Sequence, residues 1–130
     1  MSDAPLDRLK AVYERWALGD FSTTRELVAP DVEWHQSPTS VEPGVRHGHD
    51  GVERIVRGVF EAFSDFRVVA DEFLRRGPTV VVVAHVQGEA KLTGLPLDRV
   101  MAQVWRFEDG RAVRVEWYPS REEALEAAAG

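Results

Sequence analysis

The fold is decided by the stretch TVVVVAHVQGEAKL, residues 79–92, and by three similar segments beside it. These segments are FRVVADEFL (66–74), LDRVMAQVWRF (97–107) and AVRVEWY (112–118). They are rich in β-branched and aromatic residues and largely follow the period of two that is expected of strands. The segments between them contain glycine or proline and are short enough for antiparallel hairpins. The second half of the chain therefore predicts an antiparallel meander of four strands.

The first 64 residues predict helices instead. An amphipathic helix starts near Pro5 and ends at Gly19, since its apolar residues recur at helical spacing. Those residues are Leu6, Leu9, Val12, Tyr13 and Trp16. Thr23 and Glu26 have the spacing of a capping box, which predicts a short second helix that Pro30 ends. Residues 31–35 then alternate as a strand.

Residues 36–51 are rich in proline and glycine, and we interpret them as an irregular loop at the mouth of a pocket. Asp50 is the expected cap of a third helix, whose apolar stripe runs to about Ser64. Ser120 and Glu123 repeat the capping-box spacing ahead of a final helix over 121–129. The element order predicts one α+β domain over 1–130, in which a cone-shaped, curved antiparallel sheet wraps around the N-terminal helices. Such a cone leaves a hollow at its wide end.

Composition excludes several classes of function. The chain has 130 residues and no cysteine, so disulfide scaffolds, cysteine-ligated metals and cysteine nucleophiles are excluded. A net charge of −6, with no basic stripe, disfavours a nucleic-acid partner. The start of the sequence lacks the features of a signal peptide, and no stretch is apolar enough for a membrane span. We expect a cytoplasmic protein that neither enters a membrane nor, lacking a glycine-rich phosphate loop, binds a nucleotide cofactor.

Four motifs occur in the order and spacing of the nuclear transport factor 2-like superfamily. They are Gly19-Asp20-Phe21, residues 28–35 (VAPDVEWH), residues 47–52 (HGHDGV) and residues 104–111 (VWRFEDGR). More narrowly, the chain resembles the SnoaL-like, polyketide-cyclase-like branch of this superfamily over nearly its whole length. The resemblance implies a cystatin-like cone fold, a pocket for a small organic molecule, no cofactor, and pairing into homodimers. It implies no single activity, because fold does not settle function.

The chain departs from two mechanisms of that superfamily. Ketosteroid isomerases need an aspartate base and an oxyanion hole formed by a tyrosine and a protonated aspartate. Their motifs place the base at Gln36, the acidic donor at Gln103 and the tyrosine near Val12 or Tyr13. Glutamine cannot abstract a proton, but Gln103 can donate a hydrogen bond to a carbonyl oxygen. The Asp–Arg–Asp arrangement of the epoxide hydrolases is also absent, since the corresponding strand carries His85, Gln87 and Glu89.

The candidate site depends on which strand residues share a face. If the hairpin turns over residues 91–97, His85 lies opposite Gln103 and Gln87 lies near Met101, on the face that Trp105 also occupies. The resemblance adds Trp34 and Trp117 to this lining. His85 is then the candidate general acid or base, because its ordinary pKa lies near neutrality. Its ligand-binding neighbours are Trp34, Gln87, Met101, Gln103, Trp105 and Trp117. The alternative is a structural pair, with His85 hydrogen-bonded to Gln103 in an ordinary sheet.

The other histidines give weaker signals. His35 is expected to point away from Trp34, and His47 and His49 flank Gly48 ahead of a helix. Two loop histidines at this spacing do not make a metal site without a third ligand, so no metal is predicted. Glu116 has no evident basic partner in the sequence.

The opposite face of the sheet would carry an apolar surface. Its expected members are Val80, Val82, Ala84, Val86, Ala102, Val104 and Tyr118. Exposed apolar patches of this size favour association, so we expect a homodimer through this outer face. Two functions stay open: binding of a small organic molecule with isomerase, cyclase or lyase chemistry, and a non-catalytic module for ligand binding or dimerisation. A protein-binding adaptor is a third.

Overall fold

The computed structural model describes residues 4–36 and 44–129. Its helices are α1 (Ala4–Trp16), α2 (Thr24–Leu27), α3 (Gly48–Ala62) and α4 (Arg121–Ala129). Its strands are β1 (Val28–Gln36), β2 (Gly44–His47), β3 (Phe63–Arg76), β4 (Thr79–Ala90), β5 (Pro96–Glu108) and β6 (Arg111–Tyr118). Helices fill the first half and a strand meander the second, as expected for the α+β class. None of the described helices has the length and apolarity that crossing a membrane would take.

The six strands form one sheet in the order β2-β1-β6-β5-β4-β3. Strands β3 to β6 pair antiparallel through short hairpins, as predicted. β1, however, pairs parallel with β6, so the sheet is mixed rather than antiparallel throughout. Short hairpins determine the relative direction of consecutive strands only. β1 and β6 are joined through a long connection, which leaves their relative direction open. Residues 44–47 were expected to be loop and instead form β2 against β1, while residues 37–43 of that expected loop lie outside the described residues.

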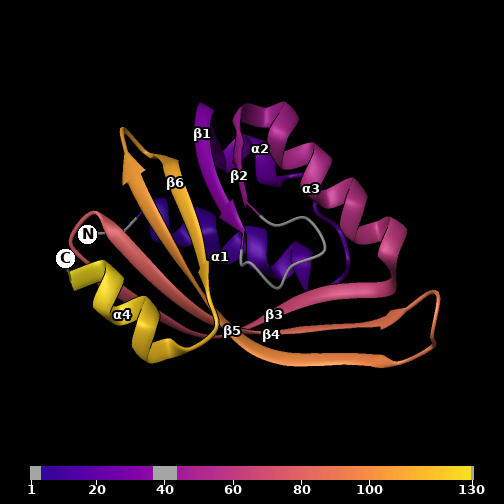
Figure 1. Cartoon of the computed structure of the whole chain (residues 1–130). Coiled ribbons are helices and arrows are strands. Elements are labelled where there is room, and N and C mark those ends of the chain that lie inside the picture. The colour runs from indigo at the N-terminus through magenta and orange to yellow at the C-terminus, as the bar shows by residue number, and fades with distance from the viewer. Residues whose placement is uncertain (1–3, 37–43, 130) are drawn as a thin grey trace.

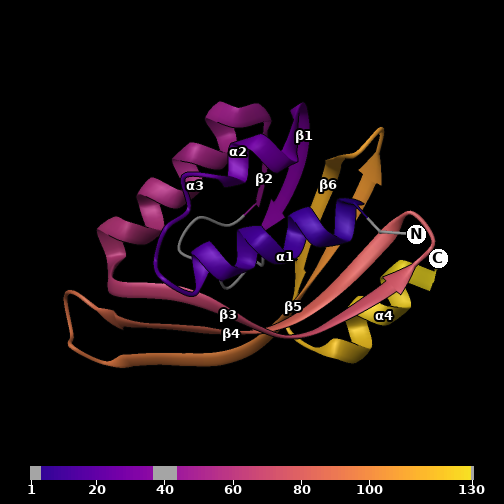
Figure 2. The same cartoon turned by 180° about the vertical axis from the view of Figure 1, so that it is seen from behind.

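The helices lie on both sides of this curved sheet. α1 crosses one side, together with α2 and α3, while α4 lies against the other side (Figures 1 and 2). The larger core is therefore enclosed between the concave, inner face of the sheet and the first three helices. A smaller cluster lies under α4, where Ala124 packs over Val81, Ala102 and Val104. The hollow predicted from the cone shape can form only on the inner side.

Of the three helix N-caps that the sequence predicts, the structure contains one and lacks two. Ser120 caps α4, since its Oγ accepts the Glu123 backbone N–H at 3.2 Å. Thr23 precedes α2 without a side-chain capping bond. α3 begins at Gly48, with His47 as its N-cap, so Asp50 lies inside the first turn instead of capping it.

The register between β4 and β5 determines which side chains point inward. Val82 lies opposite Gln103, and His85 lies opposite Val100. The hairpin closes where the Ala90 backbone N–H donates to the Leu95 carbonyl at 2.9 Å. The predicted turn was three residues out of register, and an odd shift moves every side chain of a strand to the other face. The prediction that His85 and Gln103 share a face is therefore wrong.

The same shift corrects the expected outer surface. Val80, Val82, Ala84 and Val86 were placed outside, but they belong to the inner core. The outer face carries the alternate residues of β4, including Val81 and Val83, and only one end of it is covered by α4. Tyr118, Ala102 and Val104 do lie on the outer face, as expected.

Candidate functional site

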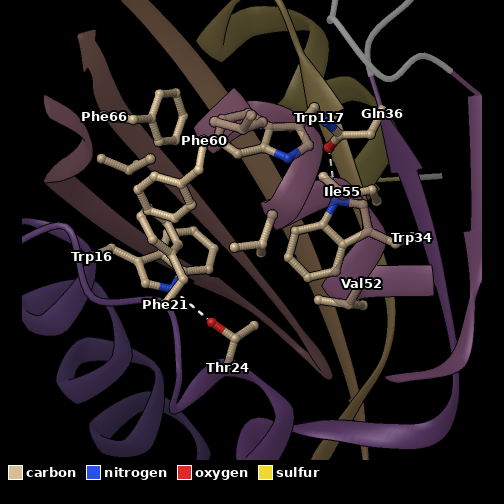
Figure 3. A pocket seen from close by; sticks show the side chains of 13 residues that line it. Trp16, Phe21, Thr24, Trp34, Gln36, Val52, Ile55, Phe60, Phe66 and Trp117 are labelled. Carbon is tan, nitrogen blue, oxygen red and sulfur yellow. Dashed lines mark hydrogen bonds between the residues drawn. The ribbon is translucent and has the colours of Figure 1, made fainter. Parts of the chain in front are cut away.

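A pocket opens between the inner face of the sheet and α3. It is lined by Trp16, Phe21, Thr24, Trp34, Gln36, Val52, Ile55, Val56, Val59, Phe60, Phe66, Val68 and Trp117. Figure 3 shows the indoles of Trp34 and Trp117 on one side, and the rings of Trp16, Phe21 and Phe66 on the other. Its cavity volume is about 60 Å³. None of these described lining residues carries an ionisable side chain, so shape, ring contacts and a few dipoles determine what the pocket binds.

Each wall of the pocket follows from a local pattern. β1 directs Trp34 inward because Val32 and Trp34 occupy alternate, buried positions of the strand. α3 turns Val52, Ile55 and Val59 toward the sheet at the spacing of three and four residues that forms one helical face. Its flanking residues, Val56 and Phe60, complete the outer wall of the pocket.

Two hydrogen bonds hold the polar side chains of this lining. The Trp34 indole N–H donates to Gln36 Oε1 at 2.8 Å. The Trp16 indole N–H donates to Thr24 Oγ1 at 2.8 Å, across the turn between α1 and α2. Both bonds are drawn in Figure 3. Two of the indoles are thus fixed in orientation, which presents flat apolar surfaces to the interior.

A second polar network lies behind the pocket wall. The Trp105 indole N–H donates to the Tyr13 hydroxyl at 3.0 Å, and that hydroxyl donates to Oε1 of Gln103. All three side chains are buried, and Gln103 is 0% exposed. Burial raises the pKa of the Tyr13 phenol well above its ordinary value, despite the opposing hydrogen bond from Trp105. Tyr13 therefore stays a protonated donor at physiological pH.

The amide nitrogen of Gln103 is the unusual atom of this network. Nε2 is buried and has no hydrogen-bond partner within the described residues. Leaving such a donor without a partner costs about 1–3 kcal/mol of desolvation. Gln103 lies directly opposite Trp117 on the same face of neighbouring strands, so this amide lies beside the pocket lining.

The structure brings together five of the seven side chains predicted for the site. Trp34 and Trp117 line the pocket. Met101, Gln103 and Trp105 point inward from β5, as predicted, but they are buried outside the lining itself. Trp105 packs edge-on against Trp34, with ring centroids 5.5 Å apart. These three residues therefore support the wall of the pocket.

The other two predicted residues, His85 and Gln87, lie on the outer face of the sheet. His85 Nδ1 lies 2.6 Å from the Asp71 carboxylate, which protrudes at an irregularity between β3 and β4. Gln87 Oε1 accepts a hydrogen bond from Arg67 Nε at 3.2 Å and pairs with Asp98 across the strands, not with Met101. As the sheet separates it from the pocket, His85 cannot act there as a general acid or base.

The remaining histidines make local contacts. His35 Nε2 lies 2.5 Å from Glu33 Oε1 on the outer side of β1, away from Trp34 as expected. His49 Nε2 lies 3.1 Å from the Val28 carbonyl and ties the start of α3 to β1. The described residues hold no group of three or more histidine or carboxylate side chains that could bind a metal ion. Glu116, expected to have no basic partner, lies 3.4 Å from Arg114.

Several lining residues were not assigned to the site from the sequence. Trp16 was interpreted as helix packing, and Phe21, Phe60 and Phe66 were not singled out. One signal was available: the apolar stripe of α3 includes Val56 and Phe60 beside its buried face, and is wider than packing on one sheet requires.

Comparison with known proteins gives the family. A sequence model described as the SnoaL-like domain matches residues 9–115, which is most of the chain. The chain belongs to the SnoaL-like domain family. Among solved structures, it is similar to an NTF2-like protein of unknown function from Burkholderia pseudomallei, with 28% identity, 100% of both chains covered and a TM-score of 0.81. The resemblance recognised in the sequence is thereby confirmed.

Two further structural neighbours carry individual names. IdmH from Streptomyces antibioticus, a proposed polyketide cyclase, is 25% identical, with 97% of this chain and 98% of that chain covered and a TM-score of 0.73. TerC, crystallised with polyporic acid, is 22% identical, with 98% and 100% covered and a TM-score of 0.79. At that identity TerC shows the shared fold alone. No protein with a curated description matches the chain.

Proposed function

We propose that this SnoaL-like protein binds a flat, mostly apolar organic molecule that carries one carbonyl or hydroxyl oxygen. The observation that carries this proposal is the buried Gln103 amide nitrogen without a partner in the described part of the chain, next to a pocket walled by aromatic rings. Aromatic walls favour flat ligands, since ring stacking adds to the burial of apolar surface. The amide supplies a directional contact.

Tyr13 and Trp105 determine how Gln103 can act. Because the Trp105 N–H occupies the Tyr13 oxygen, the Tyr13 proton is directed to Oε1 of Gln103. The carboxamide is then oriented with its NH₂ group turned away from Tyr13, and this group is a pure donor. A ligand oxygen that accepts from it removes the cost of the unpartnered amide. Carbonyl and hydroxyl oxygens are the acceptors that suit a neutral donor of this kind.

Cyclisation is the reaction that this arrangement supports best. A ring closure that transfers no proton gains from holding a flexible chain in a reactive fold and from polarising a carbonyl, and neither demands an ionised side chain. Isomerisation and elimination need a base, and the described lining provides none. The similarity to IdmH, a proposed polyketide cyclase, also favours this class. The alternative is a non-catalytic binding module, which the same lack of ionisable lining residues favours.

The test compares two bicyclic probes, 1-tetralone, which has a carbonyl, and tetralin, which has none. Gln103→Leu should weaken binding of 1-tetralone about 2- to 10-fold, the range of one neutral hydrogen bond, and leave tetralin binding unchanged. The matched control is Gln87→Leu, the same substitution on the outer face, which should change neither affinity. Saturation-transfer NMR gives both dissociation constants. Equal losses for the two probes, or no 1-tetralone binding to the unmodified protein, would refute the proposal.

The outer sheet face supports a second proposal, that two copies of the chain pair there. Beyond α4 this face carries Val100, which is 50% exposed, beside His85. In the neighbouring row, Arg67 and Asp98 flank Gln87 on either side. The surface formed by these residues with Val100 and His85 therefore carries opposite charges at its two edges. A two-fold axis brings such edges together, since each copy presents the same surface to the other. Val100→Glu should then convert a dimer to a monomer in light scattering, and a monomeric unmodified protein at micromolar concentration would refute the pairing.

A further inference from the structure

A wide groove lies on the surface directly outside the pocket. It runs between α3 and the turn that joins α1 to α2, and its cavity volume is about 570 Å³, against about 60 Å³ for the pocket. Five residues line both spaces: Phe21, Thr24, Val52, Val56 and Phe60. Side chains that line both spaces therefore lie between them.

Two phenylalanine rings form the main part of this partition. Phe21 and Phe60 meet edge to face with centroids 5.5 Å apart, and each also contacts Phe66, at 5.7 Å and 6.3 Å. Phe60 is 36% exposed, although Ile55 and Val59 of the same helix are buried. Its ring packs on Phe21 of the turn and on Phe66 of β3. Figure 3 shows the Phe60 and Phe21 rings at one side of the pocket.

Local contacts hold the backbone on both sides of the groove. Gly19 has a φ of +80°, and a Cβ there would lie 3.4 Å from the Phe66 carbonyl, so the turn passes close to β3. The Asp20 carboxylate accepts from the Ser22 N–H at 3.0 Å and closes the turn. Arg25 and Glu53 form an ion pair at 3.0 Å that links α2 to α3 across the groove. Motion of the rings, rather than of the chain, is the available way to open the partition.

The pocket volume shows why an opening is needed. A space of 60 Å³ holds only a few water molecules, whereas a bicyclic organic molecule needs several times more. Side-chain rotations at the protein surface are fast and require no unfolding. Parting Phe21 from Phe60 would join the pocket to the groove and provide the missing space.

We infer that the groove is the entrance to the pocket, and that the Phe21–Phe60 ring pair controls passage and sets the length of the molecule held. This inference rests on the proposed function and extends it. The preferred ligand is then an unsaturated molecule thin enough to pass between two rings, with one end beside Gln103 and the other end in the groove. Phe21 and Phe60 act as specificity-determining residues.

Acrylamide quenching of tryptophan fluorescence tests the entrance without any ligand. Of the four tryptophans in the chain, Trp16, Trp34 and Trp117 line the pocket and Trp105 packs against it. Phe60→Ala should raise the quenching constant about twofold or more, since it opens a route to these indoles. Phe63→Ala is the matched control: this ring also contacts Phe66, at 6.0 Å, but lines neither space, and its removal should leave quenching unchanged. Phe60→Leu, which keeps most of the apolar volume, should fall between Phe60→Ala and the unmodified protein.

A second measurement tests length selection. N-phenyl-1-naphthylamine is an uncharged probe, longer than 1-tetralone, that fluoresces in apolar surroundings. The quantity to compare is the affinity for this probe divided by the affinity for 1-tetralone. This ratio should be at least about threefold higher in Phe60→Ala than in the unmodified protein, because the added space extends along the ligand. Equal quenching in the Phe60→Ala and Phe63→Ala proteins would overturn the entrance. Faster quenching in Phe60→Ala, together with no 1-tetralone binding by the unmodified protein, would support the entrance and refute the proposed function.

Discussion

Two rows of side chains, each with a glutamine, cross the sheet on opposite faces. On the inner face, Gln103 lies between Val82 and Trp117 and is fully buried. On the outer face, Gln87 lies between Arg67 and Asp98 at the surface. The inner amide depends on Tyr13 and on a ligand that reaches its nitrogen, whereas the outer one is half-buried and bonded to Arg67. The same residue type is thus a candidate ligand contact on one face and an ordinary surface group on the other, because of strand register alone.

The largest expected contrast between the two faces is in packing. Trp105→Ala removes a fully buried indole that contacts Trp34, Trp16 and Tyr13, and should lower the free energy of unfolding by about 3–5 kcal/mol. Val100→Ala, on the outer face, should cost less than about 1 kcal/mol. Urea denaturation measures both. Similar losses would mean that the inner wall is not packed as described.

A smaller contrast is expected from two tyrosine hydroxyls. Tyr13→Phe leaves polar atoms of Gln103 and Trp105 buried without their partner, at a cost of about 1–3 kcal/mol. Tyr118→Phe removes a half-buried hydroxyl that bonds Glu116 at 2.9 Å near solvent, and should cost about 1 kcal/mol or less. Thermal and urea unfolding of the two variants provide the comparison. A larger loss of unfolding free energy in Tyr118→Phe than in Tyr13→Phe would contradict the expectation that the inner hydroxyl contributes more to stability.

The smallest effect is a pH dependence of the outer face. The hydrogen bond from His35 lowers the pKa of the Glu33 carboxyl below its ordinary value of 4.5. A depressed pKa in the folded protein means that the ionised carboxylate adds stability, fully present above pH 4.5 and lost as the pH falls through the lower folded value. Glu33→Gln should therefore flatten the decline of unfolding free energy below that pH. If the unfolding free energy of Glu33→Gln falls as steeply at acid pH as that of the unmodified protein, the Glu33 carboxylate makes no such contribution.

The sequence predicts the inner positions of two strands correctly. Alternation placed Gln103 and Trp105 of β5 on one face, and the family resemblance added Trp117 of β6; in the structure all three side chains lie on the inner face. Alternation placed His85 wrongly, because parity across a hairpin depends on the turn length, and the single glycine and single proline of the segment from 90 to 96, Gly94 and Pro96, do not fix that length.

The parallel contact of β1 with β6 could not be predicted either. Long connections leave strand direction open, and nothing in residues 28–36 states which neighbour they will take. The ring pair of the proposed entrance could not be predicted for a related reason. Phe21 and Phe60 come from a turn and a helix far apart in sequence, and their 5.5 Å contact follows only from the docking of α3 on the sheet.

The three glutamines of the chain allow a direct test of the account, since no asparagine adds signals to their side-chain NH₂ groups. The three NH₂ resonance pairs of Gln36, Gln87 and Gln103 can be assigned in ¹⁵N-labelled protein from single glutamine-to-leucine variants. Titration with 1-tetralone should shift the Gln103 pair most and leave the Gln87 pair in place. A shifted Gln87 pair with an unmoved Gln103 pair would contradict the claim that the inner face holds the ligand.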